Sequence, residues 1–456
     1  MKRKMPVHAL LLLLVAISVL HGFGAAAEAE AQSPPALKVG KNGHYLVTAE
    51  GKPFFWLGDT AWRLQLLAPD DLALYLDTRK AQGFNVIQGP ILTRDSPDYR
   101  GIANDDPAHP NEAFFKHIDR IVEETARRGM YSALVVTWGL AFDAFGGPEG
   151  ARRYGTWLGS RYRDHGNVIW IVSGEYAIER HDEPTLAVWR ALGEGLRAGS
   201  RGLRLVTLHG SWSPPALQTP STFFHTDRFL SFNMIQSGQG GNNGDGAASW
   251  RLTGSDYRKQ PVKPVIDGEA TYERPANAEH PEWNGFGVRR RAYWSVFAGA
   301  FGHTYGADIV PYFKDGWRGA LRREGAASLV HLKRLMESRP MLGRIPDDRL
   351  VEPPESETVR CRPGPIPCGV PDHVQGTRDA AGRYAMVYIP GGNRTVSVDA
   401  SRLSGARLVA WWFDPRNGAS RRIGVVPIAR DLRFTTPPGE DWVLVLDDAA
   451  QRFGAP

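Results

Sequence analysis

The chain has 456 residues, of which 42% are hydrophobic and 23% are charged, an ordinary globular mixture. This length is sufficient for one large hydrophobic core and a smaller second domain. The formal net charge is only +6. The basic residues are dispersed or lie on helical patterns such as GVRRRAYW, which we interpret as solvated helix faces. The composition therefore argues against a nucleic-acid partner.

The first 31 residues have the pattern of a secretory signal peptide. Three basic residues, Lys2 to Lys4, precede an apolar run over positions 9–20, and small residues suited to cleavage follow. The apolar run is too short to span a bilayer comfortably, and the later sequence contains no segment long and apolar enough for a membrane helix. We therefore expect a secreted or periplasmic protein with no membrane partner after cleavage.

From residue 38 to residue 345, short apolar runs alternate with helical stretches. The runs, such as FNVIQGPIL and VIWIVSGE, end in polar residues or glycine, and segments 68–83 and 111–129 have helical spacing with a closing glycine. Eight such units predict a parallel sheet with crossover helices, and their combined length favours a closed (β/α)8 barrel. An open doubly wound sheet would need a glycine-rich phosphate-binding turn after its first strand, and LGDTAW is not one.

A different pattern begins after a predicted linker at residues 345–357. Short alternating segments, among them RYAMVYIP, ARLVAWWFDP and DWVLVLDD, are separated by Gly, Pro and Asn turns. This pattern predicts a small antiparallel β-sandwich over residues 357–449.

The two cysteines, Cys361 and Cys368, lie in the segment CRPGPIPC. In an exported protein we expect a short local disulfide, with a pair of free thiols as the alternative. Further metal ligands are not evident near them, so we expect neither a metal site nor a cofactor.

Two glutamates follow predicted strands at positions where a barrel carries its chemistry. Glu175 ends the fourth strand in NVIWIVSGE, and Glu269 ends the seventh in PVIDGEATYE. In a closed barrel these ends face each other across the mouth. Glycoside hydrolysis needs such a pair, with one carboxyl group as proton donor and the other as an ionised carboxylate. Glu273 is a rival for the second role, whereas we expect Asp267 to be structural.

The other strand ends carry aromatic, amide, histidine and carboxylate side chains, which suit a carbohydrate substrate. Aromatic rings can stack on the C–H faces of a sugar, and polar groups can bind its hydroxyls. Ordinary packing or turn capping is the alternative for the tryptophans, the histidines and Asp59. The predicted substrate-binding residues are Asp59, Trp62, Gln88, Trp138, His209, Asn233, Gln236, Tyr272, His303 and Tyr305.

Five of these segments, WLGDTAW, NVIWIVSGE, FNMIQSG, PVIDGEATYE and GAFGHTYG, resemble the apiosidase-like barrel family, glycoside hydrolase family 140. The segments AWWFDPRNG and PPGEDWVLVL are similar to the β-sandwich that often follows this barrel, labelled a putative collagen-binding domain. The resemblance implies a retaining glycosidase with Glu175 as acid/base and Glu269 as nucleophile. It also implies release of apiose from plant pectin, the founding activity of the family. The sequence departs from the family at the fourth strand, which often ends in Gly-Asp and here ends in Gly174-Glu175.

A catalytically inactive barrel that binds glycan or matrix through its sandwich is the alternative from another functional class. Retention of both glutamates argues against it.

Overall fold

The computed structural model describes residues 33–93, 106–138, 142–174, 182–210, 219–238, 247–275, 283–351 and 373–456. The predicted signal peptide and both cysteines lie outside these residues. None of the described helices combines the length and the apolarity that a membrane crossing requires.

Eight parallel strands form one sheet in the order β8-β7-β6-β5-β4-β11-β10-β9. Between the two end strands, the Ser231 amide donates to the Val206 carbonyl at 2.7 Å, so the sheet is nearly closed. This topology confirms the predicted (β/α)8 barrel. The strands are β4 (Trp56–Thr60), β5 (Val86–Thr93), β6 (Tyr131–Trp138), β7 (Val168–Ile171), β8 (Val206–Thr207), β9 (Asn233–Ile235), β10 (Val265–Asp267) and β11 (Gly302–Tyr305).

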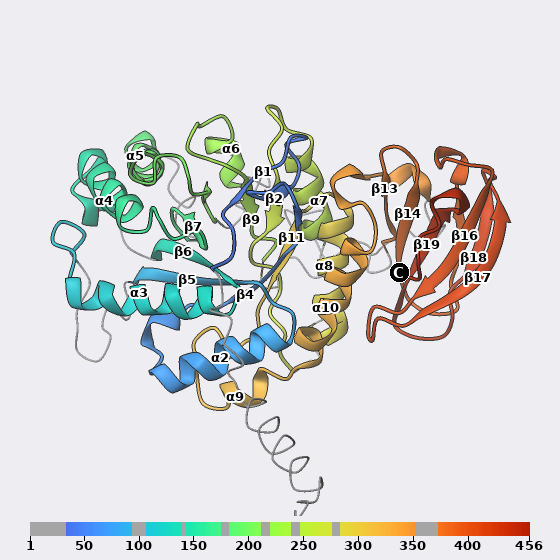
Figure 1. Cartoon of the computed structure of the whole chain (residues 1–456), viewed down its shortest axis with the longest axis horizontal. Helices are drawn as coiled ribbons and strands as arrows, with labels where there is room; N and C mark the ends of the chain where they lie inside the picture. Colours follow the sequence, from blue (N-terminus) through green and yellow to red (C-terminus); the bar gives the residue numbers. More distant parts are fainter. Residues whose placement is uncertain are drawn as a thin grey trace, which may run out of the picture. The chain divides into compact units, whose positions relative to one another are not determined.

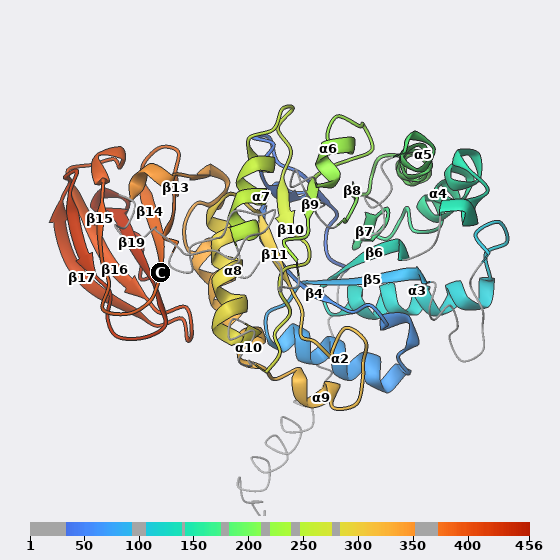
Figure 2. The ribbon, with the colours of Figure 1, turned by 180° about the vertical axis from the view of Figure 1, so that it is seen from behind.

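Helices follow the strands and surround them (Figures 1 and 2). Local sequence explains where several of them begin. The Asn111 side chain accepts hydrogen bonds from the Ala113 and Phe114 amides, and the Asp182 side chain accepts one from the Thr185 amide. The helices are α2 (Pro69–Ala81), α3 (Glu112–Arg127), α4 (Pro148–Arg161), α5 (Glu183–Gly199), α6 (Pro220–Phe224), α7 (Ala247–Tyr257), α8 (Gly285–Phe297), α9 (Trp317–Ala320) and α10 (Glu324–Glu337).

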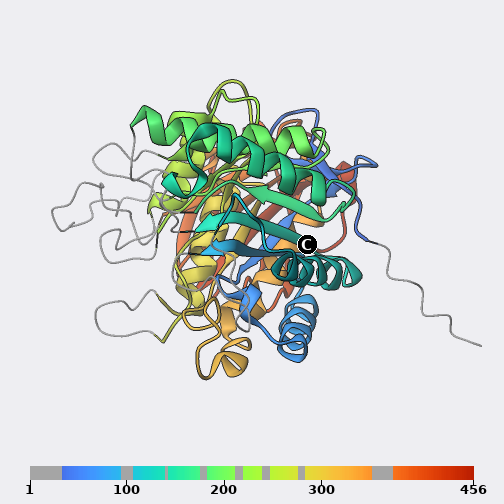
Figure 3. The same ribbon diagram turned by 90° about the vertical axis from the view of Figure 1, so that its left-hand side faces the viewer.

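Helices α4 and α5 pack side by side through glycines (Figures 1 and 3). A Cβ at Gly159 of α4 would lie 2.4 Å from the Leu196 carbonyl oxygen, and one at Gly195 of α5 would lie 2.5 Å from that of Arg152. These positions therefore require glycine, despite its low helix propensity, because the two backbones approach too closely for any side chain.

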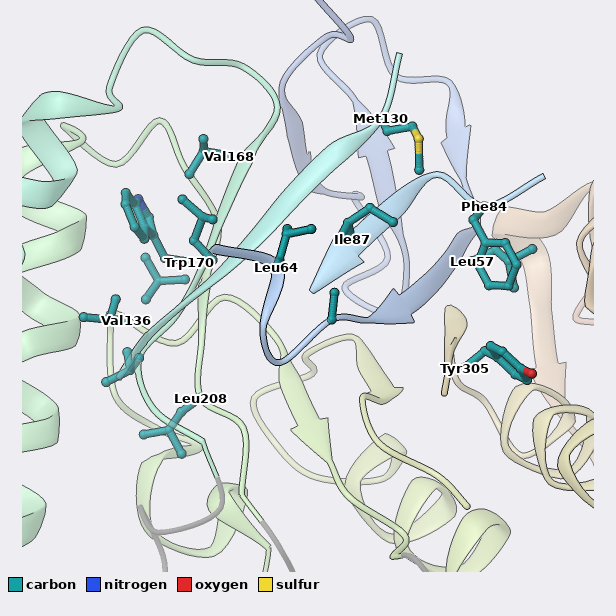
Figure 4. Packing of buried hydrophobic residues seen from close by; sticks show 14 of the residues in the cluster. Leu57, Leu64, Phe84, Ile87, Met130, Val136, Val168, Trp170, Leu208 and Tyr305 are labelled. Carbon is teal, nitrogen blue, oxygen red and sulfur yellow. The ribbon is translucent and has the colours of Figure 1, made fainter. Parts of the chain in front are cut away.

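Hydrophobic side chains fill two layers because successive residues of a strand point to opposite faces. Trp56 belongs to the cluster inside the barrel, whereas Leu57, the next residue, belongs to the cluster between barrel and helices. Figure 4 shows part of this outer cluster, including Leu57, Ile87, Val136 and Trp170 from four neighbouring strands. The face that a strand residue occupies therefore decides whether it can reach the mouth of the barrel.

The C-terminal part consists of antiparallel sheets, as predicted. Six strands pair in the order β12-β13-β14-β19-β16-β17, and β15 pairs with β18. The first strand, β12, occupies the start of the predicted linker. The strands are β12 (Arg344–Pro346), β13 (Gln375–Asp379), β14 (Tyr384–Pro390), β15 (Thr395–Val398), β16 (Arg407–Phe413), β17 (Ser420–Pro427), β18 (Leu432–Thr435) and β19 (Asp441–Asp448). At the other end of the described chain, β1 (Leu37–Val39), β2 (Leu46–Thr48) and β3 (Pro53–Phe54) form a small antiparallel sheet.

The arginines of GVRRRAYW contradict one prediction. Arg289, Arg290 and Arg291 of α8 are all buried, with at most 7% of each residue exposed. Arg289 makes two hydrogen bonds of 2.9 Å to Asp441 of β19. The prediction of a solvated helix face is therefore wrong. Helix α8 lies against the C-terminal sheet, and the Asp441 carboxylate, distant in the sequence, neutralises the Arg289 guanidinium.

Candidate active site

A cluster of four side chains, hereafter the Glu269 cluster, forms where the barrel strands end. It consists of Trp62, His209, Glu269 and Tyr272. The Tyr272 hydroxyl donates to Glu269 Oε1, and His209 Nε2 lies 3.2 Å from Glu269 Oε2. Trp62 Nε1 donates to the Tyr272 hydroxyl at 2.5 Å, and the Trp62 ring meets the His209 ring edge to face. The structure thus brings together four predicted residues from the ends of β4, β8 and β10.

Glycines allow this close arrangement. A Cβ at Gly306, just after β11, would lie 2.3 Å from the Tyr272 ring, and one at Gly268 would lie 2.5 Å from Met234 Cγ. Across the barrel, Gln88 Nε2 of β5 donates to the Gly268 carbonyl at 3.3 Å. These contacts hold the segment that carries Glu269 against the inner wall of the barrel.

The Glu269 cluster is nearly dry. Glu269 is only 3% exposed, and Tyr272 is 5% exposed. Burial and the neighbouring carboxylate raise the pKa of Tyr272 well above its ordinary value of 10.0. Tyr272 therefore remains protonated at neutral pH and acts as a hydrogen-bond donor to Glu269.

The segment that leads to Glu175 lies beside this cluster. The His209 amide donates to the Ser173 carbonyl at 3.1 Å, and the Gly174 amide donates to the Thr137 carbonyl at 3.1 Å. Glu175 itself and the side chain of Trp138 lie outside the described residues. Gln236 follows β9 and is buried, with 3% of the residue exposed.

Four predicted substrate-binding residues face the helices instead of the mouth. Two side chains of α2 bind Asp59, since Arg79 Nε donates to it at 2.7 Å and the Tyr75 hydroxyl at 2.5 Å. Asn233 Oδ1 lies 3.1 Å from His225 Nδ1, beyond the end of α6. The other two residues, His303 and Tyr305 of β11, also point toward the helices.

Alternation along β11 explains the positions of Tyr305 and His303. Thr304 accepts a 3.1 Å hydrogen bond from Trp56 Nε1 inside the barrel, so its two neighbours point outward. The Tyr305 hydroxyl donates to Glu273 Oε2 at 2.5 Å on that outer side. We therefore leave Asp59, Asn233, His303 and Tyr305 out of the proposed substrate-binding set.

The rival carboxylate Glu273 and the neighbouring Asp267, which we expected to be structural, also face away from the mouth. Glu273 Oε1 accepts a 3.1 Å hydrogen bond from the Gly325 amide in the first turn of α10, where the helix dipole favours a negative charge. Asp267 Oδ1 accepts one of 3.2 Å from the Ser237 amide, and burial raises the pKa of Asp267 to about 6. Among the described residues, no three His, Cys, Asp or Glu side chains are arranged to hold a metal ion.

Comparisons with known proteins agree with this geometry. Residues 40–343, more than half of the chain, match the family described as apiosidase-like, catalytic domain. The chain belongs to the apiosidase-like family. Residues 369–447 of this apiosidase-like chain match the family described as putative collagen-binding domain of a collagenase. Both matches confirm the resemblance of the sequence motifs.

Solved structures place the apiosidase-like barrel among glycoside hydrolases. A structure described as a glycoside hydrolase family 5 from Bacteroides vulgatus ATCC 8482 is 30% identical, with a TM-score of 0.80 over 92% of this chain and 95% of the other. Another, described as a glycoside hydrolase, is 30% identical, with a TM-score of 0.77 over 92% of this chain and 98% of the other. No curated protein matches the chain significantly. The apiosidase-like protein therefore has a glycoside hydrolase barrel.

Sequence reasoning missed the role of Thr60 in the apiosidase-like site. Its hydroxyl lies near Tyr272 on the inner face of β4, because a Cβ at Gly306 would lie 2.8 Å from Thr60 Oγ1 and 2.3 Å from the Tyr272 ring. The signal was present in the sequence, since Thr60 lies two and four residues from inward-facing Gly58 and Trp56, and side chains two apart share a face.

His303 should make the stability of the apiosidase-like fold depend on pH. Burial lowers its pKa to about 3 from an ordinary 6.5, so between these values the unfolded chain binds a proton that the folded chain does not. This contribution to stability is complete above about pH 6.5 and is lost as the pH falls toward 3. Between pH 3 and 6.5, His303→Gln should reduce the slope of the free energy of unfolding against pH by up to about 1.4 kcal/mol per pH unit.

Urea unfolding at a series of pH values measures this slope. Wild type and His303→Gln share all other titrating groups, so their difference isolates His303. The variant His109→Gln removes an imidazole whose side chain is 86% exposed and serves as the control. Parallel curves for wild type and His303→Gln would contradict the prediction.

Proposed function

We propose that this apiosidase-like chain is an exported, retaining glycoside hydrolase that cleaves a sugar from a polysaccharide side chain. Apiose on plant pectin is the first candidate substrate, as the family resemblance implies. The observation that carries the proposal is the buried Glu269 carboxylate, held between Tyr272 and His209 at the mouth of the barrel. Burial of a carboxylate is costly, and a barrel with only a structural role would gain nothing from it.

The proposed reaction has two steps. Glu269, as a carboxylate, attacks the anomeric carbon while the bond to the leaving oxygen breaks and Glu175 donates a proton to that oxygen. Glu175 then removes a proton from water, which attacks the same carbon and releases Glu269. A retaining enzyme needs the two carboxyl groups about 5–5.5 Å apart. The contacts of His209 support such an approach, because its amide binds the Ser173 carbonyl, two residues before Glu175, and its side chain lies 3.2 Å from Glu269 Oε2.

The remaining residues of the mouth are proposed to bind the sugar. Trp62 provides an aromatic surface, and Gln88 and Gln236 provide amide groups on the inner wall. We add Trp138 on sequence grounds. This strand often ends in Asp in the family, and Glu175 would extend the proton donor by about one C–C bond. The nearest variant of this proposal is therefore a glycosidase of the same family that releases a sugar other than apiose.

Export of the protein is proposed from the signal-peptide pattern of residues 1–31.

A series of aryl glycosides, including the apioside, tests the role of Glu175. Glu175→Gln should lower kcat by about 10²- to 10⁴-fold on substrates with poor leaving groups and least on those with good ones, which need little protonation. Glu123→Gln, an exposed glutamate on α3, is the matched control. Equal losses across the series, or full activity throughout, would contradict the acid/base assignment. NMR detection of the first-formed anomer distinguishes retention from inversion.

A secreted, inactive glycan- or matrix-binding protein remains the second candidate. The match of residues 369–447 to a domain described as collagen-binding favours it. It predicts binding of polysaccharide or collagen without turnover of any glycoside.

A further inference from the structure

A second concave site lies on the same face of the barrel as Glu269. It is a pocket of about 260 Å³ lined by Pro107, Pro110, Phe145, Arg153, Tyr154 and Trp157, with Ala108 at its edge. The prolines precede α3 and follow β5, whereas the other four lie in or just before α4, which follows β6. Both connections leave the carboxyl ends of barrel strands, so the pocket opens on the face where these barrels carry their chemistry.

The wall of the pocket is aromatic and firmly held. Trp157 lies one helical turn after both Arg153 and Tyr154 of α4, four and three residues along, so its side chain neighbours both of theirs. Tyr154 is buried, whereas Trp157 is half-buried. The Phe115 ring meets the Trp157 ring at 4.6 Å, and the Arg161 guanidinium lies 5.7 Å from the Trp157 ring centroid. These contacts keep Trp157 in one orientation without a ligand.

A charged group completes the rim. The Arg153 side chain is 68% exposed, and its Nη1 donates to Glu149 Oε1 at 2.6 Å. This pair spans one turn at the start of α4, so it orients the guanidinium beside the aromatic wall. The remaining N–H groups of Arg153 can donate to oxygen atoms of a ligand.

We propose that this pocket binds one pyranose unit of the polymeric substrate, remote from the bond that is cleaved. The inference rests on the proposed glycosidase function. The volume is just below the range of about 300–1,000 Å³ typical of drug-sized ligands, which suits a single ring. The aromatic and proline side chains contact its C–H face, and Arg153 donates to hydroxyl or carboxylate oxygens. Binding here anchors the polymer while a branch enters the mouth.

Kinetics on two probes test the proposal. The probes are apiose-branched pectin fragments, which can reach the pocket, and an aryl apioside, which cannot. Trp157→Ala and Arg153→Ala should raise KM for the fragments by about three- to tenfold and leave kcat/KM for the aryl apioside unchanged. Ala108→Trp, at an exposed position on the rim, should block the pocket with the same result.

Arg152→Ala is the matched control, because Arg152 is the exposed neighbour on α4 that pairs with Glu194 of α5. Melting temperatures report whether Trp157→Ala disturbs the fold. If it does, Ala108→Trp still tests the proposal, because it fills the pocket without removing a packed side chain. Unchanged KM for the fragments in Ala108→Trp and Arg153→Ala would overturn the proposal.

Direct binding separates this inference from the proposed function. If wild type hydrolyses neither probe, the proposed function fails, but calorimetric titration of wild type and Ala108→Trp with the pectin fragments still tests the pocket. Weaker binding of the fragments to Ala108→Trp supports the pocket proposal, and equal binding overturns it. Parallel titrations with oligogalacturonides and neutral xylo-oligosaccharides distinguish a carboxylate from a hydroxyl as the partner of Arg153.

Discussion

Replacing Glu269 with glutamine should lower kcat on aryl glycosides by about 10⁴- to 10⁶-fold, the range seen when the central group of a catalytic set is removed. The amide is a poor nucleophile, so the covalent intermediate cannot form. The shape of the side chain is conserved, and its contact with the Tyr272 hydroxyl can persist. The fold should therefore survive, and kcat measured beside the melting temperature separates lost chemistry from lost structure.

Glu273→Gln is the control for this substitution, since it makes the same chemical change four residues later. The Glu273 carboxylate binds the Tyr305 hydroxyl and the Gly325 amide on the helix side of the barrel. We expect Glu273→Gln to lower the stability of the fold more than the rate of the reaction, so its loss of kcat should be far smaller than that of Glu269→Gln. Comparable activity of wild type and Glu269→Gln, or an equal collapse in Glu273→Gln, would refute the assignment of the nucleophile.

Arg289→Met should lower the free energy of unfolding by about 3–5 kcal/mol, the usual cost of removing one partner of a buried ion pair. Arg289 and Asp441 both have side chains with 0% exposure, so the substitution leaves a carboxylate without its counter-ion in a dry site. Among the described side chains, the Tyr388 hydroxyl still donates a hydrogen bond of 3.0 Å to Asp441 after the substitution. Denaturant unfolding followed by tryptophan fluorescence and circular dichroism measures the change.

The double variant Arg289→Met/Asp441→Leu should recover part of this loss, because it removes the unpaired charge as well. Arg318→Met is the control, since Arg318 pairs with Asp71 at the surface, where such a pair contributes at most about 1 kcal/mol. Equal destabilisation by Arg289→Met and Arg318→Met would show that burial of the Arg289 pair has no energetic consequence.

The C-terminal sheet is part of the barrel's packing. Its residues Tyr388, Phe413 and Val443 belong to the same hydrophobic cluster as the helices around the barrel. The Tyr388 ring stacks on Tyr293 of α8 at 4.8 Å, and Arg339 makes a second buried two-point ion pair with Asp447. One face of the sheet is therefore occupied by the barrel and is closed to an external partner.

The sequence by itself determined the order of the strands, the barrel and the antiparallel C-terminal region. Apolar runs, helical spacing and glycine stops are local patterns, and local patterns are readable without coordinates. The same reasoning placed Trp62, His209, Glu269 and Tyr272 at strand ends, where the structure brings them together.

Only the tertiary structure decided which face each strand-end residue occupies. Side chains of a strand alternate between its two faces with a period of two. An error of one residue in the predicted end of a strand therefore assigns a side chain to the mouth of the barrel when it lies in the helix layer, or the reverse. Asp59 and Tyr305 therefore lie among helices, one residue from the inward-facing Thr60 and Thr304. The burial of Arg289 could not be predicted from the sequence either, because its counter-ion Asp441 is 152 positions away and no local pattern links the two residues.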